Sequence, residues 1–148
     1  MPLSDLPDDE LDFLRRNRSA AMITVGADGV AKAVRVGVAV VDGQLWSSGT
    51  QERARTRRLR RDPRCTLFVF ESGYFWLSLE TTVDILEGAE AAGFNVRLFR
   101  EMQGRPEGPL SWFGGEYDED DFRQRMLDEE RVIYQFEVQR SYGMLTAP

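Results

Sequence analysis

A group of arginines follows a short run of small polar residues near the middle of the chain, and together they could bind an anion. The polar run is Ser47-Ser48-Gly49-Thr50. The arginines are Arg53, Arg55, Arg57, Arg58, Arg60 and Arg61. Hydroxyl groups and approachable backbone N–H groups directly before a helix are the usual components of a phosphate site. This chemistry depends on where a helix begins in the segment.

Residues 50–61 are predicted to form that helix. Thr50 is a favourable N-cap, because its side-chain oxygen can accept from a backbone N–H of the first turn. Asp62-Pro63 is expected to end the helix, since the residue before a proline is driven out of helical backbone angles.

The first turn of this helix would carry two cations, Arg53 and Arg55. The N-terminal end of a helix is already partly positive, so each cation there costs roughly 0.3–1 kcal/mol unless an anion is bound. One interpretation is that Ser48, Thr50 and these two arginines hold a phosphate. The other is a capped surface helix whose arginines are only solvated, and residue types alone leave both open.

Composition excludes several other kinds of chemistry. The chain of 148 residues contains no histidine, which removes histidine-based triads, histidine zinc sites and a proximal haem ligand. Lys32 is the only lysine, and its place on an alternating strand disfavours Schiff-base chemistry. The single cysteine, Cys65, cannot form an intrachain disulfide and is expected to be buried in a strand. No metal site is expected.

The charge distribution favours a local anion site over a nucleic-acid surface. The net charge is −6, whereas positive charge is concentrated in residues 53–64 and lacks interleaved aromatic residues. The length predicts one domain over residues 1–148. No apolar run approaches the ~20 residues of a membrane span, and no signal peptide opens the chain, so a cytoplasmic protein with no membrane partner is expected.

Hydrophobic alternation predicts a mainly antiparallel β-protein with inserted helices. The predicted strands are residues 20–25, 30–41, 44–48, 64–71, 74–86 and 131–140. The predicted helices are residues 8–17, 50–61, 88–102 and 118–129. Asp-Gly pairs at 28–29 and 42–43 indicate hairpin turns. About six strands joined largely by hairpins favour a small closed or split barrel, in which the order of the chain ends after residues 141–143.

Three of these segments allow specific expectations. The valines of strand 30–41 are expected to face the core, while the small residues around Arg35 and Gly37 could admit a flat ring, a second subunit or a helix. Strand 64–71 is expected to be buried on both faces. The glycine-rich loop 103–117 is expected to pack over an edge of the barrel, with a hinged lid as the alternative.

The sequence resembles a known family, the pyridoxamine 5′-phosphate oxidase-like split β-barrel proteins. The resemblance rests on Leu45-Trp46-Ser47-Ser48, on the Arg53-x-Arg55 pair and on the segment Leu59-Arg60-Arg61-Asp62-Pro63 before an apolar strand. It extends to Trp76-Leu77-Ser78-Leu79-Glu80 and to Arg131-Val132-Ile133. Within the family, the chain is most similar to the flavin/deazaflavin oxidoreductases that use coenzyme F420.

The resemblance implies a homodimer with the cofactor in a groove between subunits. Arg55 stands where the family usually has the lysine that holds the cofactor phosphate, with Arg53 as its partner. Thr81 follows Glu80 where the family often has glycine. The implied cofactor-binding residues are Arg35, Val36, Gly37, Trp46, Ser47, Ser48, Thr50, Arg53, Arg55, Arg58 and Trp76.

The implied activity is an F420-dependent oxidoreductase that moves a hydride between the deazaflavin and an unsaturated small-molecule substrate. An FMN-dependent oxidase or reductase of the same fold, and a binding protein without turnover, are the alternatives. The cofactor carries the chemistry in such proteins, so the sequence assigns no catalytic acid or base.

Overall fold

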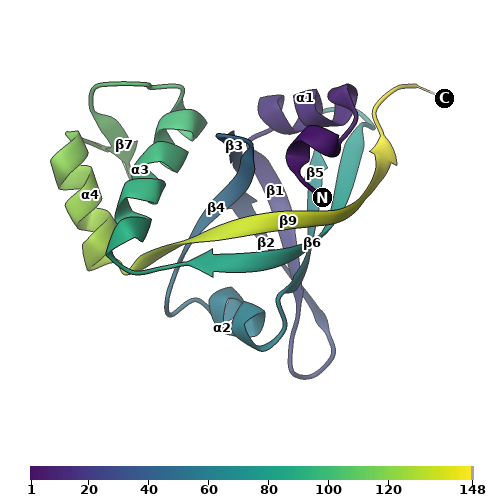
Figure 1. Cartoon of the computed structure of the whole chain (residues 1–148), viewed down its shortest axis with the longest axis horizontal. Helices are drawn as coiled ribbons and strands as arrows, with labels where there is room; N and C mark the ends of the chain where they lie inside the picture. The colour runs from purple at the N-terminus through teal and green to yellow at the C-terminus, as the bar shows by residue number, and fades with distance from the viewer. Residues whose placement is uncertain (148) are drawn as a thin grey trace.

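The computed structural model describes residues 1–147 and is built around a strongly curled antiparallel sheet (Figure 1). Seven strands lie in the order β2-β1-β5-β6-β9-β4-β3. They are β1 Ser19–Val25, β2 Ala31–Gly37, β3 Ala39–Val41, β4 Gln44–Thr50, β5 Arg64–Phe70, β6 Trp76–Leu86 and β9 Arg131–Met144. A separate two-stranded sheet pairs β7 Leu110–Trp112 with β8 Gly115–Tyr117.

A single residue, Val38, connects the two edge strands of the seven-stranded sheet, β2 and β3. Two edges joined so closely must lie side by side, which forces the sheet to curl into a split barrel. The Val38 backbone N–H donates to the carbonyl of Arg18, and the Ser47 hydroxyl donates to the carbonyl of Gly37 at 2.6 Å, so both ends of the bend are pinned.

The prediction of one strand over residues 30–41 was therefore wrong. Val36 and Val38 do enter the barrel core as expected, with Val34 and Val40 packed against it, and Ala39, which alternates with the valines, packs in a different cluster. Val30 is 53% exposed and lies outside the core. The alternation of valines is continuous through the bend, so it carries no signal for the change of pairing partner.

The barrel interior holds most of the buried apolar side chains. Its fully buried members include Phe13, Leu14, Met22, Val38, Leu67, Val69, Leu77, Leu79, Val132 and Tyr134. Alternation along residues 131–140 predicts that Val132, Tyr134, Phe136 and Val138 point inward, and all four are buried in this core. β9 runs on to Met144, so the expectation that order ends at residues 141–143 was wrong.

The helices cover the ends and one side of the barrel. They are a 3₁₀ turn Leu3–Asp5, α1 Asp8–Arg16, α2 Ala54–Arg61, α3 Ala89–Gln103 and α4 Glu119–Asp128. In Figure 1, α1 lies at the upper end of the barrel and α2 at the lower end, whereas α3 and α4 form a lobe at the left. No helix within residues 1–147 is both long enough and apolar enough to cross a membrane.

Two further expectations are corrected by tertiary contacts. β5 buries only one face, because Thr66 and Phe68 on the other face stay half-buried. The segment 103–117 is not a structureless loop, since it contains the β7–β8 hairpin. Leu110 of that hairpin is fully buried against α3 and α4, so the segment packs on the helical lobe.

Candidate functional site

The junction between β4 and α2 brings the small polar run next to the arginines. β4 continues through Thr50, which pairs with Arg131 of β9, and α2 begins only at Ala54. The prediction that Thr50 caps the helix was therefore wrong, because pairing with β9 keeps it extended. Arg53 occupies the N-cap position, and no side chain of residues 1–147 caps the helix. The first-turn N–H groups of α2 are left without intrahelical partners, as at any helix start.

Arg55 lies in this first turn and is half-buried. Its Nη2 donates to the carbonyl of Ser48 at 3.4 Å, and its guanidinium carbon lies 5.8 Å from the ring centroid of Tyr134. Its Nε is buried and has no hydrogen-bond partner among residues 1–147. Burial lowers the pKa of Arg55, and the nearby charge of Arg53 acts in the same direction. A desolvated cation with a spare donor is stabilised by an arriving anion.

The polar run on β4 divides between two faces of the sheet. The Ser48 hydroxyl donates to Oδ1 of Asn95 on α3 at 2.5 Å, and Trp46 on the same face lies against Phe94 of α3 at 5.4 Å. Trp46 also donates from its indole nitrogen to Gln135. Ser47 points the other way, toward Gly37. The hydroxyl protons of Ser47 and Ser48 are thus used within the protein.

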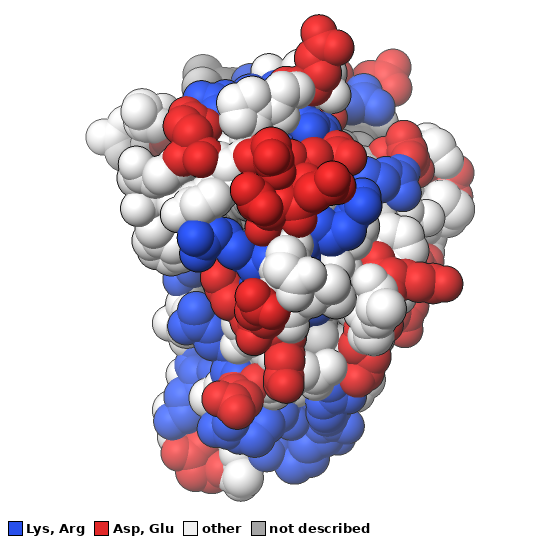
Figure 2. All heavy atoms as spheres, turned by 90° about the vertical axis from the view of Figure 1, so that its left-hand side faces the viewer, with Lys and Arg blue, Asp and Glu red and all other residues white. Residues whose placement is uncertain are grey.

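A basic hollow of about 400 Å³ lies beside this junction, between α2 and the β1–β2 turn. It is lined by Lys32, Arg57, Arg58 and Arg61, together with Gly26, Ala27, Asp28 and Ala54. Arg58 donates to the Thr24 hydroxyl at 2.8 Å and Arg61 to the Val25 carbonyl at 2.9 Å, both neutral acceptors. Much of the positive charge of α2 is therefore uncompensated, and Figure 2 shows Lys and Arg gathered at this lower end of the molecule.

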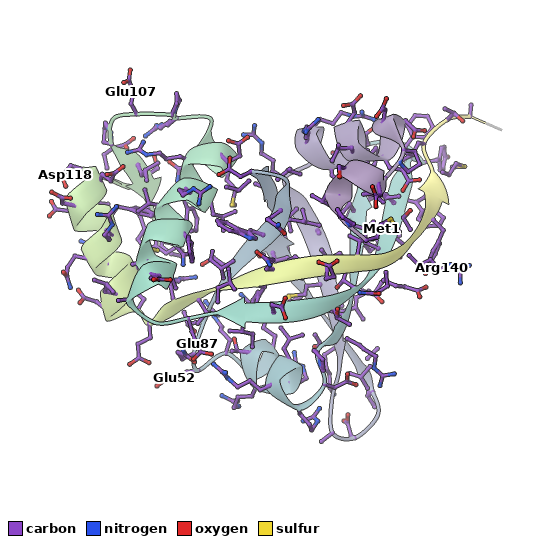
Figure 3. The ribbon with its side chains drawn as sticks, in the orientation of Figure 1. Met1, Glu52, Glu87, Glu107, Asp118 and Arg140 are labelled. Carbon is purple, nitrogen blue, oxygen red and sulfur yellow. The ribbon has the colours of Figure 1, made fainter. Side chains whose placement is uncertain are left out.

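Arg60 differs from its neighbours because an acidic residue neutralises it. Its Nη1 lies 3.0 Å from Oε2 of Glu87, the side chain labelled beside α2 in Figure 3. Gln51 also bonds to both Arg60 and Glu87. This arginine is held away from the spare donors of the junction and is a natural control for them.

The remaining candidate residues are spread over other surfaces. Val36 lies in the barrel core, and Gly37 faces Met102 of α3 so closely that a Cβ there would be 2.2 Å from its Cε. Arg35 lines a hollow of about 270 Å³ on the outer face of the sheet, opposite Ala21. Trp76 is the first residue of β6 and is half-buried.

The outer face of the sheet around Trp76 carries a cluster of aromatic rings. Trp76 lies 5.6 Å from Phe68 and 6.1 Å from Tyr142, and Phe68 lies 5.6 Å from Phe70. Phe70 is 57% exposed and Tyr142 is 43% exposed. Such a contiguous aromatic patch is typical of an interaction surface.

The structure thus brings Ser48, Thr50, Arg53 and Arg55 together at one junction, with Arg58 in the adjoining hollow. It places Arg35 and Trp76 on the outer face of the sheet and Trp46 under α3. Tyr134, Thr56 and Asn95 also contribute to the junction, and sequence analysis overlooked them. Gly49 in β4 leaves the space that the Tyr134 ring fills, but the two residues are brought together by the pairing of β4 with β9 and not by any local sequence pattern.

Other chemistry finds little support in the fold. Cys65 is 4% exposed, which confirms its expected burial, and burial raises the pKa of its thiol to about 12. The thiol is therefore protonated at neutral pH and unsuited to nucleophilic attack. Within residues 1–147, no group of three or more histidine, cysteine, aspartate or glutamate side chains is arranged to hold a metal ion.

Three solved structures resemble this one over nearly its whole length. A conserved hypothetical protein from Mycobacterium tuberculosis has a TM-score of 0.72 at 25% identity, covering 93% of this chain and 84% of that one. A protein described as an F420 reductase has a TM-score of 0.67 at 19% identity, covering 93% and 98%. A candidate pyridoxamine 5′-phosphate oxidase from Listeria innocua has a TM-score of 0.65 at 15% identity, covering 94% and 98%.

The sequence itself matches the family model described as pyridoxamine 5′-phosphate oxidase over residues 6–144. That match spans every strand of the curled sheet. With the split-barrel topology and these structural neighbours, it shows that the chain belongs to the pyridoxamine 5′-phosphate oxidase-like family.

Proposed function

We propose that this protein is an oxidoreductase that binds coenzyme F420 and moves a hydride between its deazaflavin and an unsaturated organic substrate. The observation that carries the proposal is the buried Nε of Arg55, which has no hydrogen-bond partner in the described part of the chain, at a start of α2 that no described side chain caps. A phosphate there would accept from Arg55 and from first-turn backbone N–H groups. The family membership supports a flavin or deazaflavin as the group that carries this phosphate.

The protein's own residues supply binding and orientation in this proposal. Arg55 and Arg53 hold the phosphate, and the polar run at the end of β4 sets the distance between that phosphate and the sheet. The bound cofactor supplies the hydride chemistry. No side chain is assigned as a proton donor.

The basic hollow favours F420 over FMN as the cofactor. FMN ends at its phosphate, whereas F420 continues into a longer anionic tail. Lys32, Arg57, Arg58 and Arg61 line a cavity next to the proposed phosphate site, and Arg58 and Arg61 have neutral acceptors there. Lys32 is paired with Asp28 at 3.2 Å, so Arg57, Arg58 and Arg61 are the cations that suit a chain of negative charges. FMN in the same site is the second candidate, supported by the family membership alone.

We further propose that the protein works as an isologous homodimer in the cytoplasm. The outer face of β5, β6 and β9 carries the aromatic cluster of Phe68, Phe70, Trp76 and Tyr142. A second copy would cover this face and would bring Arg35 and Trp76 to the interface.

The Arg55→Ala variant tests the phosphate site. A charged hydrogen bond is worth about 1.5–3 kcal/mol, so the affinity for F420 should fall roughly 10- to 150-fold. The melting temperature of the cofactor-free protein should hold or rise slightly, because the substitution removes a cation from the positive end of a helix. Isothermal titration and thermal melts measure the two quantities.

Arg60→Ala is the matched control on the same helix. Arg60 is paired with Glu87, and an exposed pair of this kind contributes at most about 1 kcal/mol to stability. Its loss should change F420 affinity much less than the loss of Arg55. Unchanged affinity in Arg55→Ala would remove the proposed phosphate site, and FMN binding as tight as F420 binding would favour the second candidate.

A further inference from the structure

Tyr134 occupies a position that the barrel core alone does not explain. It lies in β9, is fully buried, and its hydroxyl reaches the first turn of α2 instead of stopping in the core. The ring passes over Gly49 so closely that a Cβ at that position would lie 2.1 Å from the Tyr134 oxygen. A glycine in β4 therefore admits this side chain to the junction described above.

The hydrogen-bond direction around Tyr134 follows from counting protons. Thr56 of α2 is fully buried, and its Oγ1 lies 2.7 Å from the carbonyl oxygen of Thr50, which can only accept. Thr56 must therefore donate its single hydroxyl proton to that carbonyl. The short contact between the Tyr134 and Thr56 hydroxyls then requires Tyr134 to donate. The chain Tyr134 to Thr56 to Thr50 joins β9, α2 and the end of β4.

Arg55 directly precedes Thr56 and is held by the same tyrosine. Its guanidinium lies over the Tyr134 ring at 5.8 Å, where the electron-rich face of the ring attracts a cation. Tyr134 thus contacts two consecutive residues of the helix start, one through its hydroxyl and one through its ring. Both contacts constrain the side chain of Arg55, whose Nε finds no partner within the described chain.

We infer that Tyr134 is a positioning residue for the anion site, and that its hydroxyl orients Arg55 through Thr56. The inference rests on the proposed function, because it concerns the same phosphate. The new element is that Tyr134, on the neighbouring strand β9, holds the site in its binding geometry before an anion arrives. Preorganisation raises affinity because the guanidinium is already placed and partly desolvated before the anion arrives.

If Tyr134 only supported the fold, its substitution would weaken binding of every ligand alike. If it positions Arg55, the substitution should weaken only ligands that carry the phosphate. The useful probes are F420 and 8-hydroxy-5-deazariboflavin, which has the deazaflavin ring and ribityl chain but no phosphate. Their affinity ratio isolates the phosphate end of the molecule. Tyr134→Phe should lower F420 affinity about three- to tenfold, a loss typical of contacting residues, and leave the affinity for the phosphate-free probe unchanged.

Two Thr56 variants keep the test decisive if Tyr134→Phe folds poorly. Thr56→Val removes the hydroxyl with little change in shape and should reproduce the loss of F420 affinity. Thr56→Ser keeps the hydroxyl and should keep the wild-type ratio of the two affinities. Tyr117→Phe is the matched control, because Tyr117 lies in β8 and packs in the helical lobe. It should leave both affinities unchanged.

A double-mutant cycle separates this inference from the proposed function. If Tyr134 acts through Arg55, then Tyr134→Phe should cause no further loss of F420 affinity in the Arg55→Ala background. Additive losses, or equal losses for both probes, would overturn the positioning role while leaving the phosphate site intact. If Arg55→Ala alone leaves F420 affinity unchanged, the proposed phosphate site fails, and the positioning role fails with it.

Discussion

Gly49 shows how a single residue can decide the chemistry of its surroundings. It lies in β4 opposite Val132, and the Tyr134 ring fills the space in which a side chain would stand. Glycine is required at this position because the Tyr134 side chain approaches the backbone closely, and not because of an unusual backbone angle. The absence of one Cβ allows a buried hydroxyl to reach α2, and α2 carries the arginine with the spare donor.

Gly49→Ala should therefore disturb both stability and binding. Its Cβ would lie 2.1 Å from the Tyr134 oxygen, so the buried ring must move. Overpacking of this kind lowers the free energy of unfolding by about 1–3 kcal/mol, and F420 affinity should fall with it. Denaturant unfolding and F420 titration measure the two effects.

Gly93→Ala is the control for this substitution. Gly93 lies within α3, and a Cβ there would meet nothing within 4 Å. Alanine should raise the free energy of unfolding, by up to about 1 kcal/mol, because it favours the helix more than glycine does. Equal stability of the two variants would contradict the close approach at Gly49.

The β7–β8 hairpin packs on α3 and α4 except at its tip. Trp112 donates to Glu129 at 3.0 Å and packs edge-on against Phe99 and Phe122. Phe113 follows it in a left-handed conformation, with φ of 45°, and is 89% exposed. This conformation costs an ordinary residue about 1–2 kcal/mol, and an edge contact with Trp112 offsets only part of that cost.

Phe113→Asn should raise the free energy of unfolding by about 0.5 kcal/mol, because Asn-Gly is the favoured pair in a two-residue hairpin turn. Phe113→Ala removes the same ring but keeps the backbone strain, so it should show no such gain. Thermal and urea unfolding compare the two variants. An asparagine variant no more stable than the alanine variant would rule out backbone strain as the cause.

Considered as a whole, the molecule carries its positive charge at one end. Despite a net charge of −6, the lower end around α2 is basic, and acidic side chains gather higher on the helical lobe (Figure 2). Charges exposed to solvent are screened by salt, whereas a partly buried contact such as that of Arg55 is screened less.

The preference for F420 over FMN should therefore shrink as salt rises. The part of the affinity due to Arg57, Arg58 and Arg61 comes from partly or fully exposed cations around an open hollow. Titrations of both cofactors between low and high salt measure it. A preference that does not depend on salt would show that these residues do not contact the tail.

The aromatic cluster of Phe68, Phe70, Trp76 and Tyr142 leads us to expect a homodimer in solution. Light scattering at micromolar concentration should give about twice the chain mass of 16.9 kDa, and Phe70→Glu should shift the mass toward that of one chain. Phe113→Glu is the control, since Phe113 is equally aromatic and exposed but lies on the distant hairpin. A wild-type mass near 16.9 kDa would exclude the homodimer.

Much of the fold could be predicted from the sequence because its signals are local. The helix predicted at residues 8–17 is α1, Asp8–Arg16, and the helix placed before Asp62-Pro63 ends at Arg61. Both Asp-Gly turns join the expected strands, and the inward residues of β9 follow simple alternation. Each of these depends on neighbours a few positions away, so residue type and spacing suffice.

Only the tertiary structure decided where the strand 30–41 bends and that Thr50 continues a strand instead of capping a helix. Both outcomes depend on pairing with strands that are distant in sequence. The same holds for the junction, where Tyr134 and Thr56 are 78 residues apart and Ser48 and Asn95 are 47 apart. The sequence showed which residues can bind an anion; the closure of the barrel decided which of them share a site, because contacts at such separation leave no local pattern.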